Sequence, residues 1–163
     1  MKVLVAVDNS DASKKAVSFA SRLILGEKSD SASVTLFHVV ESLPEFIVAR
    51  STAGGAFATV AQEWSDINLK IGEQLLEAQK QTLVAAGVPA ARIHTTCRQK
   101  ESLPESSRVV AALAIIEEMK SGNYDTIVIG RRGTNALISS FLGGVAEKVA
   151  REAFGRTLCI VDA

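Results

Sequence analysis

The stretch from Asp125 to Phe154, DTIVIGRRGTNALISSFLGGVAEKVAREAF, decides how we expect the chain to fold. It begins with an apolar run at 126–129, which predicts a buried strand. The turn at 130–133, GRRG, follows at once, and Gly143 and Gly144 then open a helix with an apolar periodic face. Glycines let backbone N–H groups approach a phosphate, and the first turn of a helix presents unpaired N–H donors. The order strand, glycine turn, glycine-started helix therefore predicts an anion site.

The glycine spacing in this stretch is Gly130-x2-Gly133-x9-Gly143, which is neither the phosphate-loop motif nor the dinucleotide-binding fingerprint. Together with the start of the chain it resembles the universal stress protein family, whose nucleotide-binding members carry G-x2-G-x9-G followed by Ser or Thr. The resemblance covers nearly the whole chain, most clearly 1–40 and 125–163. Here Gly144 occupies the Ser or Thr position, so a hydroxyl that could bind phosphate is missing while the backbone N–H remains.

The bulk composition is that of one globular domain covering residues 1–163. Eighteen lysines and arginines balance eighteen aspartates and glutamates, which gives no electrostatic reason to expect nucleic acid or a membrane as partner. The apolar start is interrupted by Asp8, too early for a signal peptide, and no apolar run approaches the length of a membrane span. We therefore expect a cytoplasmic protein.

The cysteines and histidines show no pattern of a metal or catalytic site. Cys97 and Cys159 both lie inside predicted strands and match no metal-binding spacing, so we expect buried, reduced thiols. His38 and His94 lie on different predicted strands with no obvious acid or thiol partner, and we expect structural roles for both.

Strands and helices alternate along the chain. The first strand, 3–7, is apolar on both faces, as in a sheet covered by helices on both sides. Ser10 or Asp11 can cap the helix that follows, and Gly26 can end it. The later elements are predicted as strand 34–40, helix 57–86, strand 91–97, helix 102–120, strand 126–129, a helix from Gly143 and strand 157–161. Because polar and apolar residues alternate in 91–97, that segment is predicted to be an edge strand.

Three further features concern the connections and the long helix. The pentapeptide ESLPE occurs at 41–45 and at 101–105 with a capping-box pattern, which predicts two similar strand-to-helix junctions. The segment 51–56, STAGGA, is either a movable loop beside the site or a plain linker. A stripe along the helix 57–86 is expected to be its core-facing side; it consists of Val60, Trp64, Ile67, Ile71, Leu75 and Ala78.

Five strands alternating with helices predict an α/β fold of parallel β-α-β units, a single open twisted sheet with helices on both faces. Right-handed crossovers and the edge character of 91–97 favour the strand order 3-2-1-4-5, which the family resemblance also implies. In that order the first and fourth strands are neighbours at a topological switch point, where open sheets bind ligands. Asp8 and Gly130 close these two strands, so topology predicts that they share one crevice.

The expected ligand is an adenine nucleotide, ATP or else ADP or AMP, and a Mg²⁺ ion can accompany its phosphates. Backbone N–H groups of the glycine turn and the following helix would bind phosphate, and Arg131 or Arg132 either pairs with phosphate oxygens or faces solvent. Asp8 either accepts from ribose or the adenine edge, or caps the turn that follows it. The resemblance implies adenine contact with the backbone of Val39, whose side chain is expected in the core. The predicted nucleotide site comprises Ala6, Val7, Asp8, Val39, Gly130, Arg131, Arg132, Gly133, Gly143, Gly144 and Val145.

The chain shows no nucleophile elbow, metal-ligand pair or phosphate-loop lysine, so binding without fast turnover fits better than catalysis, with slow ATP hydrolysis at most. The leading hypothesis is a stress-response protein that senses or regulates through nucleotide binding. The resemblance also implies a homodimer formed through the last strand, Leu158 to Val161, at an open sheet edge. The alternative is a dimeric interaction protein of the same fold that does not bind nucleotide. We expect Gly130→Val to abolish binding and leave the fold intact.

Overall fold

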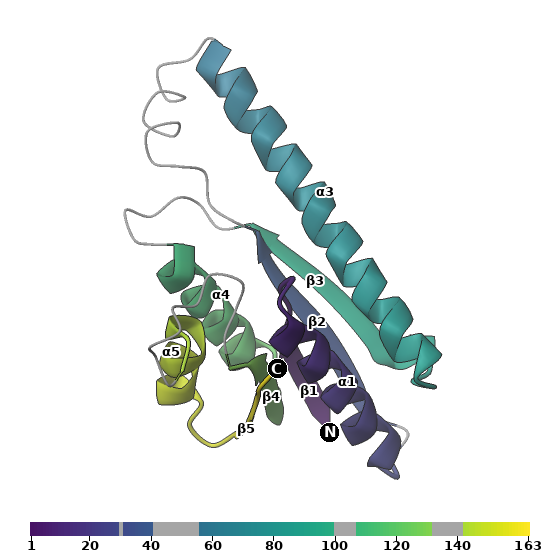
Figure 1. Cartoon of the computed structure of the whole chain (residues 1–163). Helices are drawn as coiled ribbons and strands as arrows, with labels where there is room; N and C mark the ends of the chain where they lie inside the picture. Colours follow the sequence, from purple (N-terminus) through teal and green to yellow (C-terminus); the bar gives the residue numbers. More distant parts are fainter. Residues whose placement is uncertain (30, 41–55, 100–106, 132–141) are drawn as a thin grey trace.

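The computed structural model describes all residues except 30, 41–55, 100–106 and 132–141. Strands and helices alternate along the chain and the strands form one sheet (Figure 1). The elements are β1 (Lys2–Ala6), α1 (Asp11–Gly26), β2 (Ser33–Val40), α3 (Ala56–Ala85), the 3₁₀ turn η1 (Ala90–Arg92), β3 (Ile93–Gln99), α4 (Ser107–Ser121), β4 (Thr126–Gly130), α5 (Gly144–Glu152) and β5 (Thr157–Val161).

The sheet is parallel throughout and its order is β3-β2-β1-β4-β5, which confirms the predicted topology. β1 and β4 are direct neighbours, with Val5 opposite Val128. β3 and β5 are the two edge strands. The polar character of β3 agrees with its place at an edge, where His94 and Thr95 are exposed.

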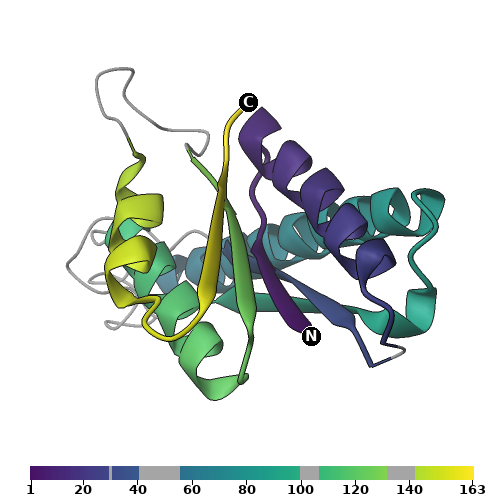
Figure 2. The same ribbon diagram turned by 90° about the horizontal axis from the view of Figure 1, so that it is seen from below.

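Helices cover both faces of the sheet, and each face has its own aliphatic core (Figure 2). On one face α1 and α3 pack over alternate strand residues such as Val3, Val5 and Leu36. On the other face α4 and α5 pack over the intervening residues such as Leu4 and Phe37. Because successive strand side chains point to opposite faces, strands that are apolar at every position produce these two layers.

Most predicted elements are present with ends shifted by one or two residues. Ser10 is the N-cap of α1, since its side chain accepts a hydrogen bond from the N–H of Ser13, and Gly26 is the last residue of that helix. The strand 157–161 has the predicted bounds. Both ESLPE segments and residues 51–55 lie outside the described residues.

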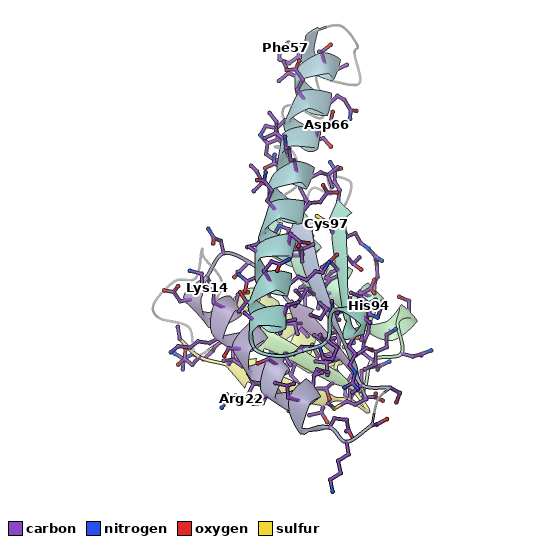
Figure 3. The ribbon with its side chains drawn as sticks, turned by 90° about the vertical axis from the view of Figure 1, so that its right-hand side faces the viewer. Lys14, Arg22, Phe57, Asp66, His94 and Cys97 are labelled. Carbon is purple, nitrogen blue, oxygen red and sulfur yellow. The ribbon has the colours of Figure 1, made fainter. Side chains whose placement is uncertain are left out.

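The predicted core stripe of α3 is wrong. Val60, Ile67 and Ile71 are 48%, 59% and 56% exposed. Ala78 is exposed as well, while Trp64 and Leu75 are half-buried. The side of α3 that meets the sheet is a different one; its buried residues are Gly72, Leu76, Gln79 and Leu83. The N-terminal part of the helix also extends beyond the tip of β3, as the positions of Phe57 and Asp66 show in Figure 3.

No helix in the described part of the chain is long and apolar enough to cross a membrane.

Candidate functional site

The predicted site lies at the edge of the sheet where the parallel strands end. β4 and β5 end at the same edge at which α1 and α5 begin (Figure 2). Since β1 and β4 are paired with Val5 opposite Val128, Asp8 and Gly130 close neighbouring strands. The crossovers from these two strands leave toward opposite faces, α1 over one and α5 over the other. This is the switch-point geometry in which open α/β sheets bind ligands.

Asp8 is tied to the start of α1. Its Oδ1 accepts hydrogen bonds from the backbone N–H of Ser10 at 2.9 Å and from the Ser10 hydroxyl. The N–H of Asp8 in turn donates to Oγ of Ser13 at 3.0 Å. The capping alternative for Asp8 is therefore realised in this structure. The carboxylate is half-buried and its Oδ2 has no hydrogen bond within the described chain, so capping leaves one acceptor oxygen for a second partner.

Gly130 packs against the first turn of α1. A Cβ at this position would lie 3.1 Å from both the Ala12 Cβ and the Ser13 nitrogen and 3.2 Å from the Ala12 carbonyl carbon. Two of these three atoms are backbone atoms of a capped helix start and cannot move freely. Gly130→Val would therefore disturb the packing of β4 on α1, and the expectation that it leaves the fold intact is not supported.

The start of α5 offers backbone donors at two of the three predicted positions. The N–H of Gly143, the N-cap residue, donates to the carbonyl of Arg131 at 2.9 Å and is already used. Gly144 and Val145 are the first two residues of the helix, where amides have no intrahelical acceptor. A Cβ added at Gly144 would meet nothing within 4 Å. The open end of α5 is thus the part of the predicted phosphate site that the geometry supports best.

Arg131 is held by the end of the chain. Its backbone N–H donates to the carbonyl of Val161 at 2.7 Å, and its Nη1 lies 3.0 Å from Oδ2 of Asp162. The guanidinium therefore pairs with a carboxylate that follows β5. Arg132 and Gly133 lie outside the described residues.

The remaining predicted residues lie at the ends of β1 and β2. Ala6 and Val7 are buried, and the Val39 side chain packs against the core on the α4 side, as expected for its side chain. The N–H of Val7 donates to the carbonyl of Phe37 at 2.8 Å, which fixes β1 against β2 at this edge.

His38 has partners that sequence reasoning missed. Its Nδ1 hydrogen-bonds the carbonyl of Val7 at 2.7 Å, so the imidazole supports a residue of the predicted site. His38 is also paired with Cys97 across β2 and β3, and both side chains approach Gly72 of α3. The register of β2 and β3 brings His38 and Cys97 together. No local sequence pattern indicates which residues of the two strands are paired.

Both cysteines are free and half-buried within strands. Burial, and secondarily the charge of Glu73, raises the pKa of the Cys97 thiol, and burial raises the pKa of the Cys159 thiol. A raised pKa keeps a thiol protonated and weakly nucleophilic, which agrees with inert structural cysteines. The described residues contain no group of three or more potential metal ligands of the His, Cys, Asp and Glu types.

Comparisons with known proteins agree on one family. The model of the universal stress protein family matches residues 1–160. The universal stress protein YxiE of Bacillus subtilis (strain 168) is 28% identical over 153 residues, which cover 92% of this chain and 91% of that protein.

Solved structures show the same fold. The universal stress protein UspA from Lactobacillus plantarum superposes with a TM-score of 0.73 at 21% identity, covering 99% of this chain and 97% of that one. A universal stress protein in complex with cAMP gives a TM-score of 0.63 at 22% identity, covering 99% and 96%. A family protein from Arabidopsis thaliana with AMP bound gives 0.55 at 18% identity, covering 99% and 91%. The family match along nearly the whole length, the strand order and the switch-point edge lead to one conclusion: this chain belongs to the universal stress protein family.

Proposed function

We propose that this protein binds an adenine nucleotide where β1 and β4 end, and that it acts in the cytoplasm as a stress-response sensor or regulator rather than as a fast catalyst. The observation that carries the proposal is the convergence of Asp8, Gly130 and the open start of α5 at one switch point. Two relatives of the same fold are described with adenine nucleotides bound, one with cAMP and one with AMP.

In this proposal the phosphates lie against the first turn of α5. The amides of Gly144 and Val145 donate to phosphate oxygens, and the positive end of the helix dipole adds attraction. The free oxygen of Asp8 accepts from a ribose hydroxyl or from the adenine edge. ATP is the expected ligand, with Mg²⁺ joining through the phosphates, because the described residues offer no carboxylate cluster that would hold the ion alone.

Substitutions at Gly144 test the phosphate placement, because a side chain there has open space around it. We expect Gly144→Asp to abolish binding, since its carboxylate would occupy the helix start and repel phosphate while stabilising the helix itself. We expect Gly144→Ser to tighten binding by about 0.5–1.5 kcal/mol through one added hydrogen bond. Gly144→Ala is the control for the added Cβ.

The measurement is equilibrium binding of labelled ATP, AMP and cAMP to the purified protein, with and without Mg²⁺, alongside thermal unfolding of each variant. Equal nucleotide affinity in Gly144→Asp and the original protein would place the phosphates elsewhere. Phosphate release well above background would show that the protein is an ATPase and overturn the non-catalytic part of the proposal.

Several observations favour the second candidate, an interaction protein of the same fold without nucleotide. The Gly143 amide, the Arg131 guanidinium and one Asp8 oxygen are already engaged within the protein. Gly144 also lacks the hydroxyl of the family pattern. Absence of binding to all three nucleotides would select this candidate.

Either function is compatible with a homodimer formed through β5. This strand is at an open edge of the sheet, and Ile160 on it is 37% exposed. Unpaired backbone groups on such an edge can pair with those of a second copy.

A further inference from the structure

The N-terminal half of α3 carries an apolar line that the described part of the protein does not cover. Val60, Ile67 and Ile71 are each about half exposed, and Trp64 between them is half-buried. At about 100° per residue, this line lies roughly 130° around the helix from the buried side at Gly72 and Leu76. α3 therefore has two apolar sides, of which only one meets the sheet.

The spacing of the exposed line is that of a coiled coil. Positions 60, 64, 67 and 71 are separated by four, three and four residues, which makes them successive d, a, d and a positions of a heptad pattern. We name this set, Val60, Trp64, Ile67 and Ile71, the α3 seam. A helix that only needed to cover a sheet would require no second seam with this period.

We propose that the α3 seam docks the α3 seam of a second copy of this chain, with the two helices antiparallel. In an antiparallel pair each a residue faces a d residue of the other helix. Val60 then packs against the partner's Ile71, and Trp64 against the partner's Ile67, and the two-fold axis repeats both layers. The axis passes between residues 65 and 66, and the seam interface is isologous.

Charges beside the α3 seam select this register. Glu63 and Lys70 occupy the g positions, both are exposed, and neither has an ion-pair partner among the described residues. In the proposed register Glu63 of each copy lies beside the partner's Lys70. Shifting the helices by one heptad, so that Val60 meets the partner's Trp64, brings the two Glu63 side chains together. In a parallel pair the flanking contacts of Glu63 would be with the partner's Asn68 and give no ion pair.

The shape of the protein leaves room for this pairing. The first turns of α3, from Phe57 to about Asp66, extend beyond the strands (Figures 1 and 3). The end of the seam at Ile71 adjoins Gly72, where the helix packs on Cys97 and His38 of the sheet. An antiparallel pair centred between residues 65 and 66 therefore places the two sheets at opposite ends of the helix pair. Four layers make a short interface, below the standard size of about 800 Å² per partner, so the dimer is expected to be weak and concentration-dependent.

Sedimentation velocity of the full chain over a wide concentration range tests the proposal. It is run on the original protein and on Ile160→Lys, in which pairing through β5 is blocked. In that background we expect a monomer–dimer equilibrium that Ile67→Lys abolishes. Glu63→Lys and Lys70→Glu should each weaken the dimer on the order of tenfold, and the double reversal should restore it. Asp66→Lys, the same charge change on the far side of α3, is the matched control and should leave the dimer unchanged.

Three outcomes would overturn the proposal. One is a protein that stays monomeric at all concentrations in the Ile160→Lys background. Another is a dimer that survives Ile67→Lys. The third is a double variant, Glu63→Lys with Lys70→Glu, that does not regain the dimer affinity lost in the two single variants. Circular dichroism must show that every variant is folded. The last result would exclude the antiparallel register even if the helices associate.

Discussion

Tyr124 is the only tyrosine of the chain and lies in a polar network beneath α4. Its hydroxyl donates to Oε1 of Glu118 at 2.9 Å, and the other oxygen of that carboxylate lies 2.8 Å from Nη2 of Arg98. The ammonium of Lys2 lies 4.5 Å from the centre of the tyrosine ring. These contacts join α4 to strands β1 and β3 around one neutral phenol.

Burial of the ring, together with the hydrogen bond to Glu118, raises the pKa of Tyr124 to about 12 from an ordinary value of 10.0. The neutral phenol is thus the form that the fold favours. Its contribution to stability is complete below pH 10 and disappears as the pH rises toward 12. We expect phenolate absorbance to appear with a midpoint about two units above that of free tyrosine, which a spectrophotometric titration can follow at one residue. A midpoint near 10 would show that the network does not hold in solution; Tyr124→Phe gives the baseline.

Gly72 joins α3 to the ends of the strands. A Cβ at this position would lie 2.8 Å from Sγ of Cys97 and 2.8 Å from Cδ2 of His38, whose ring is anchored on Val7. The missing side chain lets the long helix approach the sheet where β2 and β3 carry these two bulky groups. The close approach also places α3 against the His38 ring, which hydrogen-bonds Val7 of the candidate site.

A helix interior normally favours alanine over glycine by about 1 kcal/mol. At Gly72 we expect the reverse, because Gly72→Ala forces Cys97 and His38 aside and should destabilise the protein by about 1–3 kcal/mol. Urea unfolding measures the change. The Cys97→Ala background is the control: removing the sulfur should recover part of the loss. Increased stability of Gly72→Ala in the original background would mean that the helix does not approach so closely.

The misplaced stripe on α3 shows what helical periodicity alone cannot decide. By hydropathy, the side with Val60, Ile67 and Ile71 should be buried in preference to the side with Gly72 and Gln79. In the structure the second side packs against the sheet. Close approach needs a small residue there, and a single sequence does not show which side must approach closely. Amphipathic patterns predicted that 57–86 is helical but not which of its two apolar sides is buried.

At the scale of the whole molecule, the strand order could be predicted from three features of the sequence and of β-α-β units. These are the right-handedness of the crossovers, the alternation of strands and helices, and the edge character of 91–97. The placement of Asp8 and Gly130 at the ends of neighbouring strands followed from that order. The individual contacts at this edge could not be predicted from the strand order. The Gly143 amide is bonded to Arg131, Gly130 packs against Ala12, and His38 hydrogen-bonds Val7. Such contacts depend on register and loop geometry, which topology leaves open.

The two sheet edges differ in a way that bears on assembly. β3 shows exposed polar residues such as His94 and Thr95, whereas β5 shows Ile160 and the nearby Phe154, which is 77% exposed. If two copies pair through β5, Ile160→Lys should convert that dimer to monomer by placing charges against each other at the joined edges. The comparison is made in the Ile67→Lys background, in which pairing through the α3 seam is blocked. Light scattering after size exclusion measures the mass, and Thr95→Lys on the opposite edge is the control. A dimer unchanged by Ile160→Lys would exclude the β5 edge as its interface.

The backbone of Arg131 is hydrogen-bonded both to the end of β5 and to the start of α5. Its N–H is bonded to Val161 at the end of the edge strand, and its carbonyl is bonded to Gly143 at the start of α5. One residue therefore connects the start of α5 to the end of the edge strand β5. If copies of the chain pair through β5 and a ligand that shifts Arg131 changes their association constant, thermodynamic reciprocity requires association to change ligand affinity by the same factor.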